Sequence, residues 1–330
     1  MRSVRDGLKH LLLGRTNFPQ QFTLGLQEPQ DLVDVLLCGL GEPLNVTQTH
    51  MMACGAPLTI CVGLSPALAE RVHGARLTLK FSDRGLGSTL GEISLRHVST
   101  ITAGEQRLCM FHVADYANYC LPRLRLWAHY LQYARSFRPD QNPDVPITRR
   151  EARAMIIFYL CPRPVVLVTV EVGESRNMFP MNLMGYVGDG YFAFALNSHR
   201  CVAPLVDRAR RVVLSTVPLQ EAATAVSLRS NHRKASIPWS DLPFPLIRPD
   251  RITMPVPAFA LDAREMQVEA AYPLGSHTLF LAKTVNSERF ARGSHFFSAH
   301  GLYQAWRQRT PPRASTGETD VPPYLKPFNP

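Results

Sequence analysis

Residues 177–200 read NMFPMNLMGYVGDGYFAFALNSHR, a methionine-rich loop that leads into a strand of alternating large and small residues and then into a polar turn ending in arginine. A weaker version of this order, NVTQTHMMACGAPLTICVGLSPAL, occupies residues 45–68. At a constant offset of 132 residues the two stretches and their upstream flanks show identities without a gap, including Asn45 with Asn177 and Val33 with Val165. Such a repeat predicts two related structural units.

A second offset, of 171 residues, pairs GEQRLCMF at 104–111 with GSHTLFLA at 275–282, and AHYLQY at 128–133 with AHGLYQ at 299–304. The alternative interpretation is that two β-rich segments align through their alternation alone. If the repeat is real, the difference between 171 and 132 assigns 39 extra residues to the second copy. We place them near residues 218–260.

This extra segment contains seven prolines, which exclude a central strand and disfavour a helix interior. The sequence therefore predicts a long irregular excursion. Long loops on a rigid scaffold are often lids or binding segments. A strap that covers a sheet edge is the equally weighted alternative.

The remaining pattern predicts a mainly β chain with a few short helices. Short runs rich in β-branched and aromatic residues predict strands at 165–172, 191–196, 211–217 and 279–285. The clearest helix is expected over 147–160, where Thr148 and Glu151 form the pattern of a capping box. We expect this helix to link the two copies.

Composition limits the classes of function. The chain has 330 residues, 45% of them hydrophobic, which is enough for two domains. The net charge of +10 is spread over both halves, and no long basic helix or stacking motif accompanies it, so no nucleic-acid partner is expected. Seven cysteines without metal-ligand spacing indicate a cytoplasmic protein with no metal site. The amino-terminal apolar run is too short for a signal peptide or a membrane span, so no membrane partner is expected.

Motifs of hydrolases, dinucleotide folds, P-loops and zincins are absent. A resemblance to a known family is carried by four stretches in order, together with a closing segment. The four are PRPVVLVT at 162–169, the loop opened by Asn177, the turn Asn197–Arg200 and GSHTLF at 275–280, and the closing segment is HGLY at 300–303. Over about 155–307 the chain resembles the flavin reductase-like family, which has an FMN-binding split barrel.

The resemblance implies an FMN site along the loop after Asn177, with the ribityl phosphate near the turn that ends in Arg200. Its expected cofactor-binding residues are Asn177, Phe179, Pro180, Met181, Asn182, Asn197, Ser198 and Arg200. It implies a catalytic role for His277, close to flavin and nicotinamide. Two departures stand out: the family often has Thr or Ser where this chain has Phe179–Met181, and a hydroxyl residue where it has Cys201.

Split barrels of this family generally pair around their cofactor, so the duplication predicts two tandem split β-barrels forming an intramolecular pseudo-dimer. We expect a degenerate barrel at 1–146, the FMN-binding barrel at 147–310 and a proline-rich extended tail at 311–330. The first copy has Gln106 opposite His277 and Leu68 opposite Arg200, so one FMN site is expected. A homodimer of two such chains is compatible with this arrangement.

The resulting functional hypothesis is an FMN-dependent oxidoreductase that transfers hydride between NAD(P)H and flavin or a small substrate. The alternative is a non-catalytic split barrel that binds flavin or haem. The expected partners are therefore free flavin or another small molecule.

Overall fold

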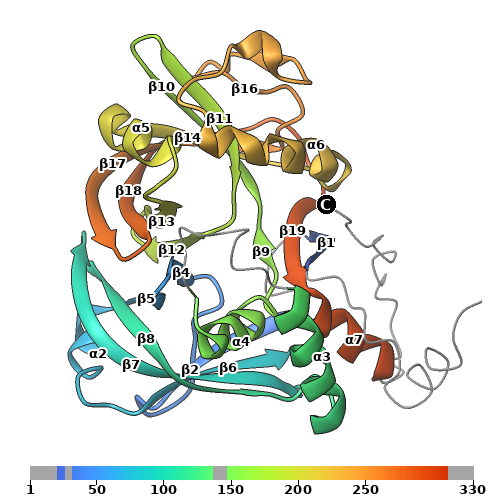
Figure 1. The fold of residues 1–330 in the computed structure, drawn as a ribbon. Helices are drawn as coiled ribbons and strands as arrows, with labels where there is room; N and C mark the ends of the chain where they lie inside the picture. The colour runs from blue at the N-terminus through green and yellow to red at the C-terminus, as the bar shows by residue number, and fades with distance from the viewer. Residues whose placement is uncertain (1–20, 27–31, 137–146, 311–330) are drawn as a thin grey trace, which may run out of the picture.

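The computed structural model describes residues 21–26, 32–136 and 147–310. Two seven-stranded antiparallel sheets dominate it, and the mainly β prediction is confirmed (Figure 1). The first sheet has the order β3-β2-β6-β7-β8-β5-β4. Its strands are β2 (Val33–Cys38), β3 (Leu44–Asn45), β4 (His50–Gly55), β5 (Leu58–Leu64), β6 (Leu77–Asp83), β7 (Thr89–Ala103) and β8 (Gln106–Asn118).

The second sheet has the order β11-β10-β14-β17-β18-β13-β12. Its strands are β10 (Val166–Val172), β11 (Ser175–Met181), β12 (Met184–Gly188), β13 (Tyr191–Asn197), β14 (Arg211–Thr216), β17 (Asp262–Leu274) and β18 (His277–Arg289). When β2 is matched with β10 and the others follow along the chain, the two orders are the same. The sheets therefore share one topology.

Each sheet curls around its own apolar core. All seven strands of the second sheet contribute to one buried cluster, which includes Val168, Phe194, Leu214 and Phe280. The first sheet encloses a corresponding cluster built around Phe111. Because strands from both edges face the same interior, we call the sheets the first barrel and the second barrel.

The long hairpins of the two barrels correspond residue by residue at the offset of 171. The β7–β8 hairpin is bulged between Ser94 and Leu95, and the β17–β18 hairpin between Glu265 and Met266. A second bulge also recurs, at His97/Ser99 and at Val268/Ala270. A bulge changes the twist and direction of a strand, so its recurrence at the same two places indicates the same local shape in both hairpins.

The offset of 132 holds only in part. It is correct for β5 and β13, since Ile60 pairs with Phe111 as Phe192 pairs with Ala282. It is wrong by one residue for β2 and β10. Val33 faces the first core, and the equivalent residue in the second core is Val166, whereas Val165 packs in a different cluster outside that core. A slip of one residue moves every side chain of a strand to the other face.

The barrels meet at a tightly packed seam. A buried cluster there combines Met51 and Met110 of the first barrel with Val187 and Leu281 of the second. The backbones also approach closely, since a Cβ added at Gly63 would lie 2.6 Å from the Val187 carbonyl oxygen. Burial of this apolar surface holds the barrels together.

Contacts across the seam are reciprocal. Gln106, which begins β8, donates a hydrogen bond from Nε2 to Asp189 of the second barrel at 3.3 Å. His277, which begins β18, accepts one from the Gly55 N–H of the first barrel at 3.4 Å. Equivalent positions thus contact equivalent turns, which is the pattern of a two-fold interface.

A smaller sheet and two helices join the halves. Strand β1 (Gln21–Leu26) pairs with β19 (His295–His300), which pairs with β9 (Arg163–Pro164). Helix α4 (Arg149–Phe158) has the predicted capping box and packs on the first barrel, as does α7 (Gly301–Arg309). The core of the first barrel therefore includes residues from both sides of position 146, and the division at that position stays a prediction.

The other helices are short or peripheral. Helix α3 (Arg123–Ser136) follows β8 beside α7, while α2 (Pro66–Glu70) and α5 (Val202–Ala209) follow β5 and β13 (Figure 1). The proline-rich tail expected at 311–330 lies outside the described residues.

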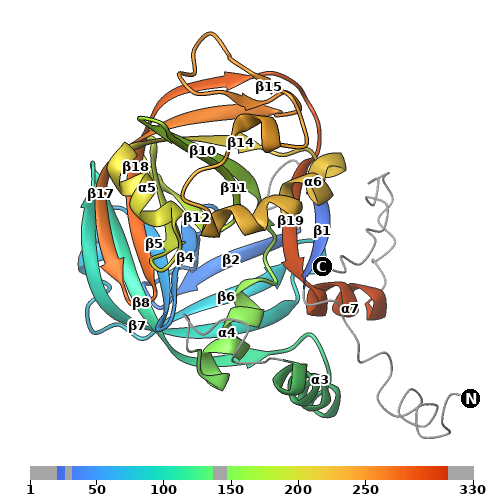
Figure 2. The same cartoon turned by 45° about the horizontal axis from the view of Figure 1, so that its top comes forward.

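The extra segment lies where the two offsets place it, between β14 and β17. It contains η3 (Leu219–Glu221), α6 (Ala222–Ser227), η4 (Leu228–Arg233), η5 (Trp239–Asp241), β15 (Leu246–Ile247) and β16 (Val256–Pro257) (Figure 2). It covers the edge strand β11, to which Asn177 Nδ2 ties it by donating to the carbonyls of Asn231 and Lys234 at 3.1 and 2.7 Å. The predicted strap over a sheet edge is therefore present.

Candidate functional site

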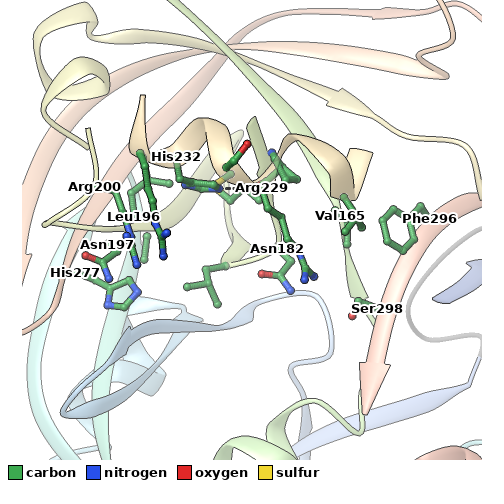
Figure 3. A pocket seen from close by; sticks show the side chains of 17 residues that line it. Val165, Asn182, Leu196, Asn197, Arg200, Arg229, His232, His277, Phe296 and Ser298 are labelled. Carbon is green, nitrogen blue, oxygen red and sulfur yellow. Dashed lines mark hydrogen bonds between the residues drawn. The ribbon is translucent and has the colours of Figure 1, made fainter. Parts of the chain in front are cut away.

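A cavity of about 550 Å³ lies between the second barrel, the extra segment and β19. We call it the arginine pocket. Its barrel side is formed by the end of β11, the loop to β12 and the end of β13, and its other side by η4. In Figure 3, His277, Asn197 and Arg200 lie together at one end, whereas Val165, Phe296 and Ser298 lie at the other.

The charged side chains that line the pocket are all basic. Arg200 comes from the turn before α5, and Arg229 and Arg233 come from η4. Neither Asp nor Glu lines this cavity. Such a set of guanidinium groups produces a positive potential that favours an anionic ligand.

Local hydrogen bonds fix the turn that presents Arg200. The Asn197 side-chain Oδ1 accepts from the His199 N–H at 2.9 Å, and the Asn197 carbonyl accepts from the Arg200 N–H at 3.0 Å. Cys201 Sγ donates to the Arg233 carbonyl at 3.1 Å, which links the turn to η4. The two arginine-bearing elements are thus held against each other.

His277 lies at the seam, where the first barrel determines its protonation. Ser276 Oγ accepts from the Ala56 N–H at 3.2 Å and donates to His277 Nδ1 at 2.8 Å, and Gly55 N–H also points to Nδ1. Because Nδ1 accepts, the ring proton of the neutral imidazole belongs on Nε2. Burial lowers the pKa of His277 to about 4, so the ring is neutral at pH 7.

His232 is the second imidazole in the pocket. Its Nε2–H donates to the Pro180 carbonyl at 2.8 Å, and its ring lies 4.7 Å from that of Phe179. Burial lowers its pKa, and the nearby positive charges of Arg200 and Arg229 act in the same direction. His232 therefore fastens η4 to the end of β11.

Six of the nine side chains expected from the sequence line this one cavity. They are Pro180, Met181, Asn182, Asn197, Arg200 and His277. Asn182 also hydrogen-bonds the buried Tyr159, whose pKa is raised by burial. The fold thus brings together, in one cavity, expected residues from three separate segments of the sequence.

The other three expected residues do not line the pocket. Asn177 is fully buried and anchors the extra segment, and Phe179 is fully buried in the second core. The expectation of a loop after Asn177 was wrong, because residues 175–181 form β11 and alternate between two buried sides. Ser198 is exposed, and its Oγ pairs with Thr278 Oγ1 at 3.0 Å.

Sequence reasoning missed the residues that η4 contributes. The signal was present as the basic cluster RSNHRK at 229–234, which includes Arg229, His232 and Arg233. The seven prolines of the extra segment leave no periodic pattern, so the directions of these side chains could not be predicted from the sequence. Of the two interpretations of the extra segment, the strap is seen in the structure; its 228–234 part also lines the cavity, and its role as a binding segment stays a prediction.

The first barrel has a different set of groups at the corresponding positions. Gln106 takes the place of His277 and is hydrogen-bonded to Asp189. Leu68, expected opposite Arg200, packs against the first core. The imidazole of His277 and the guanidinium of Arg200 therefore have no counterpart at these two positions.

The described residues contain neither a metal-binding cluster nor a membrane-spanning helix. In the part of the chain that the structure describes, no group of three His, Cys, Asp or Glu side chains is placed to hold a metal ion. The helices in those ranges are too short or too polar to cross a membrane.

Residues 158–300 match the family model of the flavin reductase like domain. A search of curated proteins found no match. Among solved structures, the chain is similar to an NADH:FAD oxidoreductase from Streptomyces globisporus, with 16% identity over 46% of this chain and 89% of that chain and a TM-score of 0.41. It is also similar to an FMN-binding protein from Thermus thermophilus, with 22% identity over 39% and 73% of the two chains and a TM-score of 0.35.

Proposed function

Because residues 158–300 form a flavin reductase like domain, we propose that the chain is an FMN-binding oxidoreductase whose cofactor occupies the arginine pocket. The observation that carries this proposal is the pocket itself, which joins an all-basic set of charged side chains to an apolar wall. Its volume of about 550 Å³ falls within the usual range for small-molecule and cofactor sites.

The donor set fits the phosphate end of FMN. Arg200 directly precedes α5, whose first-turn amides carry the positive end of the helix dipole. Arg229 and Arg233 face the same cavity from η4. We assign the phosphate to these three guanidinium groups, of which Arg200 corresponds to the family turn.

The wall from Pro180 to Leu183 fits the flat ring of the flavin. Pro180, Met181 and Leu183 offer apolar surface, and Asn182 places an amide among them. When bound, FMN supplies the hydride chemistry of the site, with NAD(P)H as the reductant. Asn182 and Asn197 then serve as the polar groups that orient the ring.

His277 contributes a hydrogen-bond donor rather than a charge. With a pKa of about 4 its imidazole is neutral at pH 7, and the seam holds its proton on Nε2. We infer that this N–H stabilises negative charge that develops on the ligand. The first barrel takes part in this function because Gly55 and Ala56 fix the orientation of the ring through Nδ1 and Ser276.

The shared topology supports a tandem duplication in which only the second copy keeps a cofactor site. Gln106 and Leu68 replace the imidazole and the guanidinium of the functional copy. Linkage of both barrels in one chain keeps the degenerate partner at the seam at a high effective concentration. We therefore propose one FMN per chain.

The test is titration of FMN into the full-length protein, followed by flavin fluorescence, and then steady-state oxidation of NADH and NADPH. Arg200→Ala should weaken FMN binding about tenfold or more, since charge-assisted hydrogen bonds contribute about 1.5–3 kcal/mol. His277→Ala should slow reduction more than it weakens binding. Arg208→Gln, an exposed arginine of α5 outside the pocket, is the matched control.

Three outcomes separate the candidate functions. FMN binding with turnover supports the oxidoreductase. Tight FMN binding without NAD(P)H oxidation supports the non-catalytic alternative, and a haem spectrum in the purified protein would support its haem-binding form. Absence of FMN binding, or binding unchanged by Arg200→Ala, contradicts the assignment of the arginine pocket.

A further inference from the structure

A second cavity, of about 440 Å³, lies at one end of the second barrel. We call it the barrel-mouth cavity. It opens where β10, β12 and β17 begin and where β14 and β18 end, and Thr47 and Gln48 of the first barrel close one side. Val165 and Phe296 line both this cavity and the arginine pocket. The Val165 N–H donates to the Phe296 carbonyl at 3.0 Å, so a pair of hydrogen-bonded strand residues separates the two sites.

The floor of the barrel-mouth cavity is apolar. Val166, Met184, Phe192 and Leu214 belong to the core of the second barrel, and each keeps a small accessible area where it lines the cavity. Water in contact with such a floor is displaced favourably by an apolar group. The floor therefore selects a ligand with an aromatic or aliphatic body.

The rim of the same cavity is basic. Arg264, Arg289 and His295 line it, against a single carboxylate, Asp262. Asp262 Oδ1 is engaged by Thr216 Oγ1 at 2.7 Å. Among the described residues, Arg264 and Arg289 make no ion pair within 4.0 Å. Asp262 lies opposite Arg289 in the β17–β18 pairing, so three arginines, with Arg163, face one carboxylate and the cavity keeps a net positive charge.

Arg264 lies at the boundary between floor and rim. Its guanidinium carbon is 5.3 Å from the centre of the Phe192 ring, a cation–π distance. Arg264 is exposed, and this contact places its guanidinium directly beside the apolar floor. A carboxylate attached to a body on the floor would reach it without a long linker.

The inner wall adds a further positive charge. Arg163 is 4% exposed and lines the cavity. Its Nη2 donates to the backbone carbonyls of His50 and Met184, and its Nη1 donates to His50 Nε2. Its Nε has no hydrogen-bond partner, and no carboxylate among the described residues pairs with it. A buried cation without a counter-ion favours an anion nearby, since its field is weakly screened.

From this combination we propose that the barrel-mouth cavity binds a small organic acid, with its apolar body on the core floor and its carboxylate against Arg264 and Arg289. The mouths of β-barrels are frequent ligand sites. Arginine and carboxylate pair in bidentate geometry, which would orient the ligand. This site is separate from the FMN site and does not depend on the oxidoreductase proposal.

The test is isothermal titration of the full-length protein with benzoate as the probe, and with benzyl alcohol and inorganic phosphate as comparison probes. Benzoate should bind with 1:1 stoichiometry. Arg264→Gln and Arg289→Gln should each weaken it about tenfold or more, because each removes a charged partner of the carboxylate. Arg289 is exposed, so its variant keeps the fold, and Arg208→Gln is the control that should leave binding unchanged.

The comparison probes and one further variant decide between sites. Benzyl alcohol and phosphate should each bind at least tenfold more weakly, because one lacks the charge and the other lacks the apolar body. Benzoate binding that is lost in Arg200→Ala but kept in Arg289→Gln would place the probe in the arginine pocket and overturn the proposal. Phosphate binding as tight as benzoate binding, or no benzoate binding at all, would overturn it as well.

Discussion

Gly275 offers a direct measurement of how much the seam contributes to stability. It turns the chain between β17 and β18 with φ of +50°, a region in which a side chain is strained. A Cβ at this position would lie 2.2 Å from the carbonyl oxygen of Ala56 and 2.7 Å from Pro57 Cδ. Because the nearest atom belongs to backbone, Gly275→Ala must push the β4–β5 turn away from the second barrel.

The expected effect has two parts. The left-handed conformation itself costs about 1–2 kcal/mol for a residue with a side chain. Displacement of the turn also breaks three seam hydrogen bonds, from Ser276 N–H to Ala56, from Ala56 N–H to Ser276 Oγ and from Gly55 N–H to His277, at about 1 kcal/mol each. Gly275→Ala should therefore lower the free energy of unfolding by about 4–5 kcal/mol.

Urea unfolding at pH 7.5 measures this difference, and the chain supplies matched controls. Gly173→Ala has the same sign of φ, +57°, with no atom within 4 Å of the added Cβ, so only the first part applies. Gly104→Ala, at the corresponding position of the first hairpin, meets the movable ring of Tyr191 and should lie between the two. Equal losses for Gly275→Ala and Gly173→Ala would refute the seam as a rigid contact.

Three further predictions concern pH, the strap and the pocket charge. Burial lowers the folded pKa values of His50 and His300 to about 3 and that of His277 to about 4. The unfolded chain therefore takes up protons first, and the free energy of unfolding should fall as the pH drops from about 6.5 to 4, by up to about 1.4 kcal/mol per pH unit for each histidine. In urea titrations this free energy should depend less steeply on pH for His277→Gln, and an unchanged dependence would contradict the buried neutral ring. Asn177→Ala removes two hydrogen bonds to the extra segment and should cost about 2–3 kcal/mol, measured by thermal unfolding, whereas a loss below about 0.5 kcal/mol would mean that the strap is held elsewhere. Arg233→Gln should weaken FMN binding and reduce its dependence on salt, and an unaltered salt dependence in fluorescence titrations would remove Arg233 from the phosphate site.

The sequence predicted the elements that repeat and the residues that stand in a recognisable pattern. The strand runs, the place of the extra segment and the capping box at Thr148 and Glu151 all follow from local chemistry. Arg200 and His277 could be selected because the stretches around them, the turn at 197–200 and GSHTLF at 275–280, resemble those of a known family. These features depend on neighbours in the chain, which a sequence displays.

Two errors arose where tertiary packing decides. The identity of Val33 with Val165 suggested a register that is off by one residue, and only the side on which each core lies could correct it. Asn177 was expected at the cofactor because the family resemblance implies a flavin-side loop there, yet it lies in β11, fully buried and hydrogen-bonded to the strap. The contribution of η4 to the arginine pocket depends on a fold-back of irregular chain, for which no periodic signal exists.

The pairing of β1 with β19 has a consequence for folding. Gln21 lies opposite His300, so two segments 279 positions apart must meet before their backbone groups are paired. Contacts so distant along the chain form late and slow the folding reaction. Until β19 and α7 dock, the first barrel lacks the strand and helix that finish its core, and its apolar surface is open to chaperones.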